Sequence, residues 1–131
     1  MNPPSRDIAA MLDESAAALG LTFATNLFVG EMPTTPDACV TVYDTGGYAP
    51  EPGYVYERPT VQVAVRGARD GYLVAHTLAQ DVRDVLNGDV NDSINSARYI
   101  AIWCESDVLF AGYDDNHRPL FTVNFRIHRT G

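Results

Sequence analysis

Lysine is absent from the chain, and all nine of its basic residues are arginine. This absence excludes lysine Schiff-base chemistry, a lysine general base and the phosphate-binding lysine of a P-loop. Cysteine is nearly absent, because only Cys39 and Cys104 are present, 65 residues apart. That separation fits neither a zinc ligand pair nor a redox motif. We expect both to be reduced thiols packed as small hydrophobic groups, in a protein made in a reducing cytosol.

Positive charge and long apolar runs are also scarce. Nine basic residues oppose 17 acidic ones, which gives a formal net charge of −8. Because phosphate binding requires clustered positive charge, we expect no sequence-specific binding of nucleic acid. The longest apolar run, Tyr99–Cys104, has six residues, whereas a membrane-spanning helix needs ~20. No apolar segment typical of a secretory signal lies near Met1, so we expect no membrane partner.

The remaining composition is typical of a globular protein. The chain has 131 residues, of which 46% are hydrophobic and 20% are charged, values close to the averages for soluble domains. No repeat, low-complexity segment or linker divides the sequence. We therefore predict a single domain over residues 1–131.

Two amphipathic helices are predicted. Ser5 is a candidate N-cap and Gly20 a candidate C-cap of the first. Between them, residues at helical spacing form a stripe: Ile8, Met11, Leu12, Ser15, Ala16 and Leu19. The acidic residues Asp7, Asp13 and Glu14 fall outside this stripe.

The second helix is expected from about Asp70 to Asn87, closed by Gly88. Its stripe consists of Val74, Leu78, Val82, Val85 and Leu86, with Ala75 and Ala79 beside it.

Alternating and β-branched residues predict strands between these helices and after them. The expected strands cover residues 22–29, 38–43, 60–66, 98–104, 108–113 and 120–129. The last has the strictest pattern, since Phe121, Val123, Phe125 and Ile127 point to one side. Residues 30–37 and 89–97 are expected to be loops, and residues 114–118 a hairpin turn. This order predicts an α+β fold, with a mainly antiparallel or mixed sheet and two helices on one face.

Residues 44–59 form the most unusual segment, because sixteen residues without a periodic pattern are longer than an ordinary connection. It contains the Gly46-Gly47 pair, three prolines and three tyrosines, Tyr48, Tyr54 and Tyr56. Tyrosine is enriched in interface cores, and proline stiffens a projecting loop. We predict an interface loop here. In the alternative interpretation, the tyrosines cover their own domain.

A second candidate interface is the sheet face that the helices leave uncovered. If the strands at 60–66 and 120–129 are neighbours, the residues of this face are Gln62, Arg66, Thr122, Asn124, Arg126 and His128. Gln62, Arg66 and Arg126 are the interface candidates among them. A simply hydrated face is the alternative.

No catalytic, cofactor-binding or metal-binding pattern is recognisable. Asp89, Asn91 and Ser93 resemble the start of a calcium loop, but Ile94 and Ile100 occupy the positions that require Gly and Glu. No Gly-x-Ser-x-Gly or glycine-rich phosphate-binding motif is present. We therefore expect an assembly component without enzymatic activity, cofactor or metal.

Several segments together resemble one family. They are Val42–Gly47, Arg58–Gly67, Asp114–Arg118 and Phe121–Phe125, in this order around the second helix. This order is similar to that of the tail terminator proteins of long-tailed bacteriophages, also labelled minor capsid or tail completion proteins. The resemblance covers most of the chain. It departs from the family at the hairpin turn, where His117 replaces a glycine.

The resemblance implies a structural virion protein at the head–tail junction, assembled in the host cytoplasm. Its partners would be copies of itself in a ring, expected to be hexameric, the tail tube protein, and the head–tail connector or head-closure protein. The ring would end polymerisation of the tail tube, and genome DNA would pass through its lumen. A negatively charged ring would repel that DNA rather than hold it.

Other functions remain open at this point. One is a head-closure or neck protein of similar size. Another is a small enzyme that uses Asp114, His117 or His128. A third is a monomeric domain that binds a peptide along an edge strand.

Overall fold

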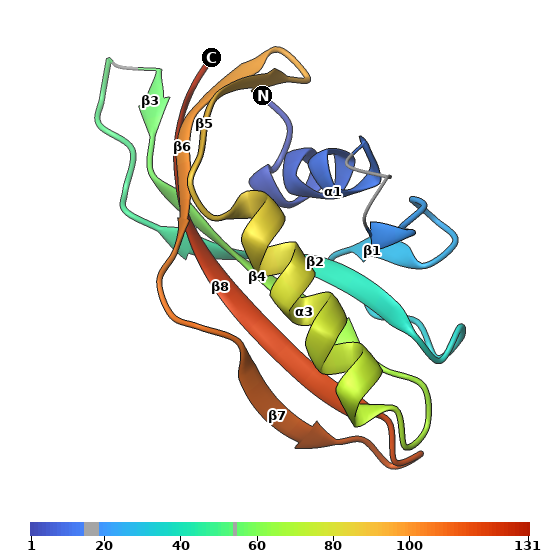
Figure 1. Ribbon diagram of the computed structural model, residues 1–131. Coiled ribbons are helices and arrows are strands. Elements are labelled where there is room, and N and C mark those ends of the chain that lie inside the picture. The colour runs from blue at the N-terminus through green and yellow to red at the C-terminus, as the bar shows by residue number, and fades with distance from the viewer. Residues whose placement is uncertain (15–18, 54) are drawn as a thin grey trace.

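The computed structural model describes residues 1–14, 19–53 and 55–131, and it has a mixed sheet of eight strands. Both described helices lie against the same face of this sheet (Figure 1). The elements in chain order are α1 (Pro4–Glu14), β1 (Leu27–Val29), β2 (Cys39–Gly47), β3 (Tyr56–Glu57), β4 (Pro59–Arg66), α3 (Tyr72–Leu86), β5 (Asp89–Ile94), β6 (Ala97–Cys104), β7 (Leu109–Tyr113) and β8 (Pro119–Thr130). The predicted α+β class is confirmed.

Strand β8 organises the sheet, whose main path is β1-β2-β4-β8-β6-β5. It has 12 residues and pairs with β4 and then β3 along one edge. Its other edge pairs with β7 at the start and with β6 at the end. Only the short strand β1 joins its neighbour β2 in parallel; the other described pairs are antiparallel. β8 therefore brings residues that are distant in sequence onto one surface.

The strict alternation predicted for the last strand is confirmed. Phe121, Val123, Phe125 and Ile127 are at most 1% exposed. They pack beside Val61, Val63 and Val65 of β4, which are fully buried. The helices cover this apolar face with Ile8 and Leu12 of α1 and Ala75, Ala79, Val82 and Leu86 of α3. Removal of these side chains from water is the main favourable contribution to folding.

Helix α3 lies close to its predicted position but is rotated from the expected orientation. Its buried residues are Ala75, Ala79, Val82 and Leu86, whereas Val74 is 78% exposed. The prediction that Val74 belongs to the core is wrong, because the two alanines face the sheet instead. Leu73 is also 78% exposed, so this helix presents apolar side chains to solvent.

Helix α1 begins at Pro4, two residues before the start that an N-cap at Ser5 predicts. Ser5 is therefore inside the helix rather than its N-cap. Its backbone N–H and its hydroxyl donate to the two carboxylate oxygens of Asp44 on β2, at 2.9 and 2.6 Å. A carboxylate from the sheet thus satisfies the start of the helix, where negative charge is favourable. The predicted stripe residues Ser15 and Ala16 lie outside the described residues.

Two predicted loops contain strands. Asp44 to Gly47 extend β2 and pair with the start of β4, and Tyr56–Glu57 pairs with the end of β8. The connection between β2 and β3 is therefore shorter than sixteen residues. Gly47 permits the close approach at this point, because its φ is 110° and a Cβ would clash with the carbonyl oxygen of Arg58.

The predicted loop at 89–97 is instead the hairpin β5–β6. Its two turn residues, Asn95 and Ser96, have φ values of 50° and 69°, the left-handed conformation of tight hairpin turns. The polar sequence of β5 concealed this strand, since an edge strand does not need an apolar pattern. The hairpin turn predicted at 114–118 is present, and His117 adopts a φ of 56°.

Candidate interaction surface on the sheet

The sheet face opposite the helices carries most of the predicted interface residues. Gln62 lies opposite Asn124 in the register of β4 and β8, and Thr60 lies opposite Arg126. The amide of Gln62 donates to Asn124 Oδ1 at 3.3 Å. The structure therefore brings Gln62 and Arg126 onto one surface, as the alternation predicted.

Aromatic and arginine side chains gather on this face at the end of β8. We call the following six residues the aromatic–arginine cluster: Tyr48, Tyr56, Arg58, Trp103, Arg126 and His128. The Tyr48 ring lies 4.7 Å from the guanidinium carbon of Arg58 and 5.7 Å from that of Arg126. Tyr48 nevertheless remains 55% exposed. This ring packs on its own domain and still offers much of its surface to a partner.

His128 lies at the centre of the aromatic–arginine cluster. Its ring centroid is 4.8 Å from that of Trp103 on β6 and 5.5 Å from that of Tyr56 on β3. Nδ1 of His128 and the hydroxyl of Tyr56 form a short hydrogen bond. The pairing of β3 with β8 therefore positions Tyr56, which is 37% exposed, beside the imidazole. Tyr54, the third predicted tyrosine, lies outside the described residues.

Two positive charges of the cluster are at most weakly paired with carboxylates. Within the described part of the chain, Arg58 forms no ion pair. Nε of Arg126 is 3.7 Å from Glu105 and has no hydrogen-bond partner there. In a chain of net charge −8, two such arginines make this face locally attractive to a negatively charged surface.

The environment of His128 lowers its pKa, first because the ring is partly removed from water and then because Arg58 and Arg126 repel its charged form. We expect Arg58→Gln to raise the pKa of His128 toward the ordinary value of about 6.5. Because folding lowers this pKa, the His128 contribution to stability should fall as the pH drops below about 6.5. NMR titration of the imidazole measures the shift. Arg69→Gln is the matched control, and an equal effect of both variants would contradict the proposed repulsion.

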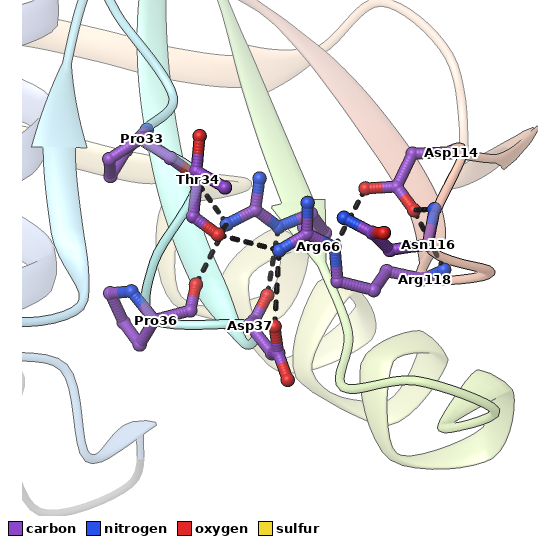
Figure 2. A network of polar contacts seen from close by, with 8 residues as sticks. All are labelled: Pro33, Thr34, Pro36, Asp37, Arg66, Asp114, Asn116 and Arg118. Carbon is purple, nitrogen blue, oxygen red and sulfur yellow. Dashed lines mark hydrogen bonds and ion pairs between the residues drawn. The ribbon is translucent and has the colours of Figure 1, made fainter.

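Arg66 is not on the open part of this face. It is only 5% exposed, although the sequence predicted an exposed residue. Figure 2 shows its guanidinium surrounded by the loop at 33–37, where Nε donates to the carbonyl of Asp37 and one NH₂ group donates to the carbonyls of Pro33 and Pro36. These hydrogen bonds from Arg66 hold the loop at 33–37 against the outer face of β2 and β4.

Arg118 holds the same loop from the hairpin turn (Figure 2). It donates to the carbonyl of Thr34 at 2.6 Å and forms ion pairs with Asp37 and Asp114 at 3.1 and 2.7 Å. Asp114 also accepts from the backbone N–H groups of Asn116 and Arg118. Through these hydrogen bonds and its ion pair with Arg118, Asp114 stabilises the turn at 114–118.

The described residues do not assemble into a recognisable reaction centre. His117 stacks on Tyr113 in the turn before β8, whereas His128 lies near the other end of that strand. In residues 1–14, 19–53 and 55–131, no three His, Cys, Asp or Glu side chains are grouped as metal ligands. Cys39 and Cys104 are free, and burial raises the pKa of both thiols, which disfavours the reactive thiolate.

A small hollow of about 240 Å³ lies beside Tyr48 and is lined by Asp44, Glu57, Arg58 and Arg129 among others. This volume is below the range of ordinary small-molecule sites. Among the described helices, none is long and apolar enough to cross a membrane.

The sequence did not single out Arg58 or Trp103. Arg58 lies in a segment without periodicity, and Trp103 lies in the apolar run that the sequence places in a core strand. The pairings of β3 and β6 with β8 bring both residues to the cluster, and no local pattern predicts these pairings. One signal in the sequence could have identified Trp103. Successive residues of a strand point to opposite faces of the sheet, so Trp103 lies on the face opposite to that of the buried Ile102.

Comparison with known proteins gives a family and a fold. A family described as bacteriophage tail terminator protein matches residues 11–130. Among solved structures, a chain from the virion of a native gene transfer agent particle superposes with a TM-score of 0.75 and 16% identity, over 98% of this chain and 96% of that one. A second solved chain has a TM-score of 0.53 and 14% identity, over 95% and 96% of the two chains. No curated protein matches significantly.

Proposed function

This chain belongs to the bacteriophage tail terminator family, and we propose that it forms a ring that ends polymerisation of the tail tube. A structural, tail-completion role in a phage or phage-like virion follows from that membership. In the proposed arrangement the ring is a hexamer at the head-proximal end of the tube. It contacts the tube protein on one side and the connector or head-closure protein on the other.

The family match carries this proposal, because it spans residues 11–130. That range includes the last four residues of α1, all of the sheet and the whole of α3. We treat residues 1–131 as one domain, since side chains from both helices and from strands along the sheet contribute to the same hydrophobic cluster. The fold shared with a chain of a gene transfer agent virion supports the proposal independently of sequence identity.

The surface described above fits an assembly role. Tyr, Trp and Arg are the residues that dominate protein–protein interfaces, and the aromatic–arginine cluster contains only these types and His128. We propose that Tyr48, Tyr56, Gln62 and Arg126 contact a neighbouring protein. Tyr54 remains a candidate from the sequence alone. Arg66 is not proposed, because the loop at 33–37 covers it.

The net charge of the chain fits a conduit for DNA. A ring of copies with a charge of −8 each would have a repulsive potential toward phosphate. We propose that genome DNA passes through the lumen without being held there.

Polymerisation of the purified tube protein from the same phage tests the proposal. Addition of this protein should stop tube growth and give short tubes capped at one end, as seen by electron microscopy. Heat-denatured protein is the control. A head-closure or neck protein would instead leave tube lengths unchanged and bind the head side, which is the alternative function that this experiment separates.

A further inference from the structure

Helix α3 presents a mixed apolar and acidic face away from the sheet. Leu73 and Val74 at its start are each 78% exposed. They line a hollow together with Leu19, Thr77, Leu78 and Asp81. Because Ala75, Ala79, Val82 and Leu86 face the sheet, this hollow lies on the outward side of the helix. Two exposed aliphatic side chains side by side are unusual on a surface without a partner.

The same helix ends in negative charge. Asp81 and Asp84 lie on α3, and Asp107 ion-pairs with Arg83 at 2.7 Å. Arg83 also pairs with Asp84 at 3.0 Å, and the side chain of Asp84 is 66% exposed. Two carboxylates, those of Asp84 and Asp107, thus share one guanidinium, and Asp81 adds a further negative charge on the helix. The outward face of α3 is therefore apolar at its first turn and acidic toward its end.

The aromatic–arginine cluster lies on the opposite side of the sheet. It offers the half-exposed Tyr48 ring and two arginines: Arg58, which lies beside that ring, and Arg126, whose ion pair with Glu105 is long, at 3.7 Å. The two faces are complementary, since one supplies aromatic rings and positive charge and the other an apolar hollow and negative charge. Each face belongs to the same chain, but they point in opposite directions.

We propose that the aromatic–arginine cluster of one copy packs against the outward face of α3 in a second copy. Two different faces on opposite sides of a molecule give a head-to-tail contact, which repeats from copy to copy and closes a ring if the rotation allows. A partner with other chemistry is less well matched, because this one chain supplies both complementary surfaces. The biological role of this contact rests on the proposed ring. The inference adds which two surfaces of neighbouring copies meet in that ring.

Two variants, each with one altered face, test this contact. The sheet-face variant carries Tyr48→Glu and Arg126→Glu. The helix-face variant carries Leu73→Arg and Val74→Arg, at positions that are 78% exposed. Arg69→Glu, outside both faces, is the control. Thermal unfolding establishes that each variant is folded, and sedimentation velocity up to the solubility limit measures self-association.

We expect the wild type and the control to self-associate, and each variant to do so at least ~10-fold more weakly. An equimolar mixture of the two variants should form a 1:1 complex and nothing larger, because only one pair of intact faces remains. A mixture that stays monomeric would overturn the proposal. A wild-type chain that stays monomeric up to the solubility limit, whether or not a DNA duplex binds at the cluster, would overturn it as well. If both variants still end tube growth, the contact is wrong and the proposed function stands.

Discussion

Replacement of Arg129 by methionine is expected to lower the free energy of unfolding by about 3–5 kcal/mol, because it leaves a buried carboxylate without its cation. Arg129 on β8 is 5% exposed, and Asp7 on α1 is fully buried. Their side chains are 3.3 Å apart, and Arg129 also pairs with Glu57 on β3 at 2.8 Å. The hydroxyl of Tyr99 donates to Asp7 at 2.5 Å but cannot neutralise it. Chemical denaturation measures the loss.

Two further variants isolate the charge effect at Arg129. Arg98→Met removes an exposed arginine of the neighbouring strand β6 and should change the stability by less than about 1 kcal/mol. Asp7→Asn combined with Arg129→Met should be less destabilised than Arg129→Met alone, since no buried charge is then unpaired. A stability of Arg129→Met equal to that of the Arg98→Met control would contradict this account.

Replacement of Arg66 by methionine is expected to cost about 3 kcal/mol, because several loop carbonyls lose a charged donor. The guanidinium of Arg66 donates to the carbonyls of Pro33, Pro36 and Asp37 at 2.6, 2.7 and 2.8 Å. Methionine retains the length of the side chain but donates no hydrogen bond. Arg66→Glu, at a position that the sequence placed on an open face, should be more harmful still, since it turns a carboxylate toward carbonyl oxygens.

The effect of Arg66 should be concentrated in the loop at 33–37. Limited proteolysis should cut this loop in Arg66→Met before the rest of the chain unfolds. Arg66→Lys should recover only part of the stability, because a lysine lacks the planar fork that reaches several acceptors. Arg69→Met is the control. Protease resistance of the loop in Arg66→Met, equal to that of the wild type, would show that Arg66 does not hold it.

The sequence predicted the parts of the fold that depend on local periodicity. The alternation from Phe121 to Ile127 identified a strand with one buried face, because a period of two has no other simple explanation. The helical spacing of apolar residues predicted the start of α3 to within about two residues, but it did not predict which side of the helix faces the sheet. The stripe that it proposed through Val74 and Leu78 differs by a small rotation from the observed stripe through Ala75 and Ala79. The prediction gave most weight to the large aliphatic residues. In the structure the small alanine side chains face the sheet, because they allow the helix to pack closely against it.

The candidate site depended on contacts between distant segments, which the sequence does not encode locally. Asp7 was expected outside the buried stripe of its helix, but Arg129 lies 122 positions away and makes its burial possible. Arg66 was expected to be exposed because the alternation along its strand placed it on the uncovered sheet face, and only the folded loop at 33–37 supplies the carbonyls that bury it. Gln62 and Arg126 were placed correctly on one face, because that prediction needed only alternation and neighbouring strands.

The length of tail tubes in particles made without this gene tests the central claim most directly. If the chain ends tube polymerisation, electron micrographs should show tubes of variable and excessive length that lack heads. Expression of the wild-type chain from a plasmid should restore a single length. Tubes of normal, uniform length in the absence of the gene would contradict the account.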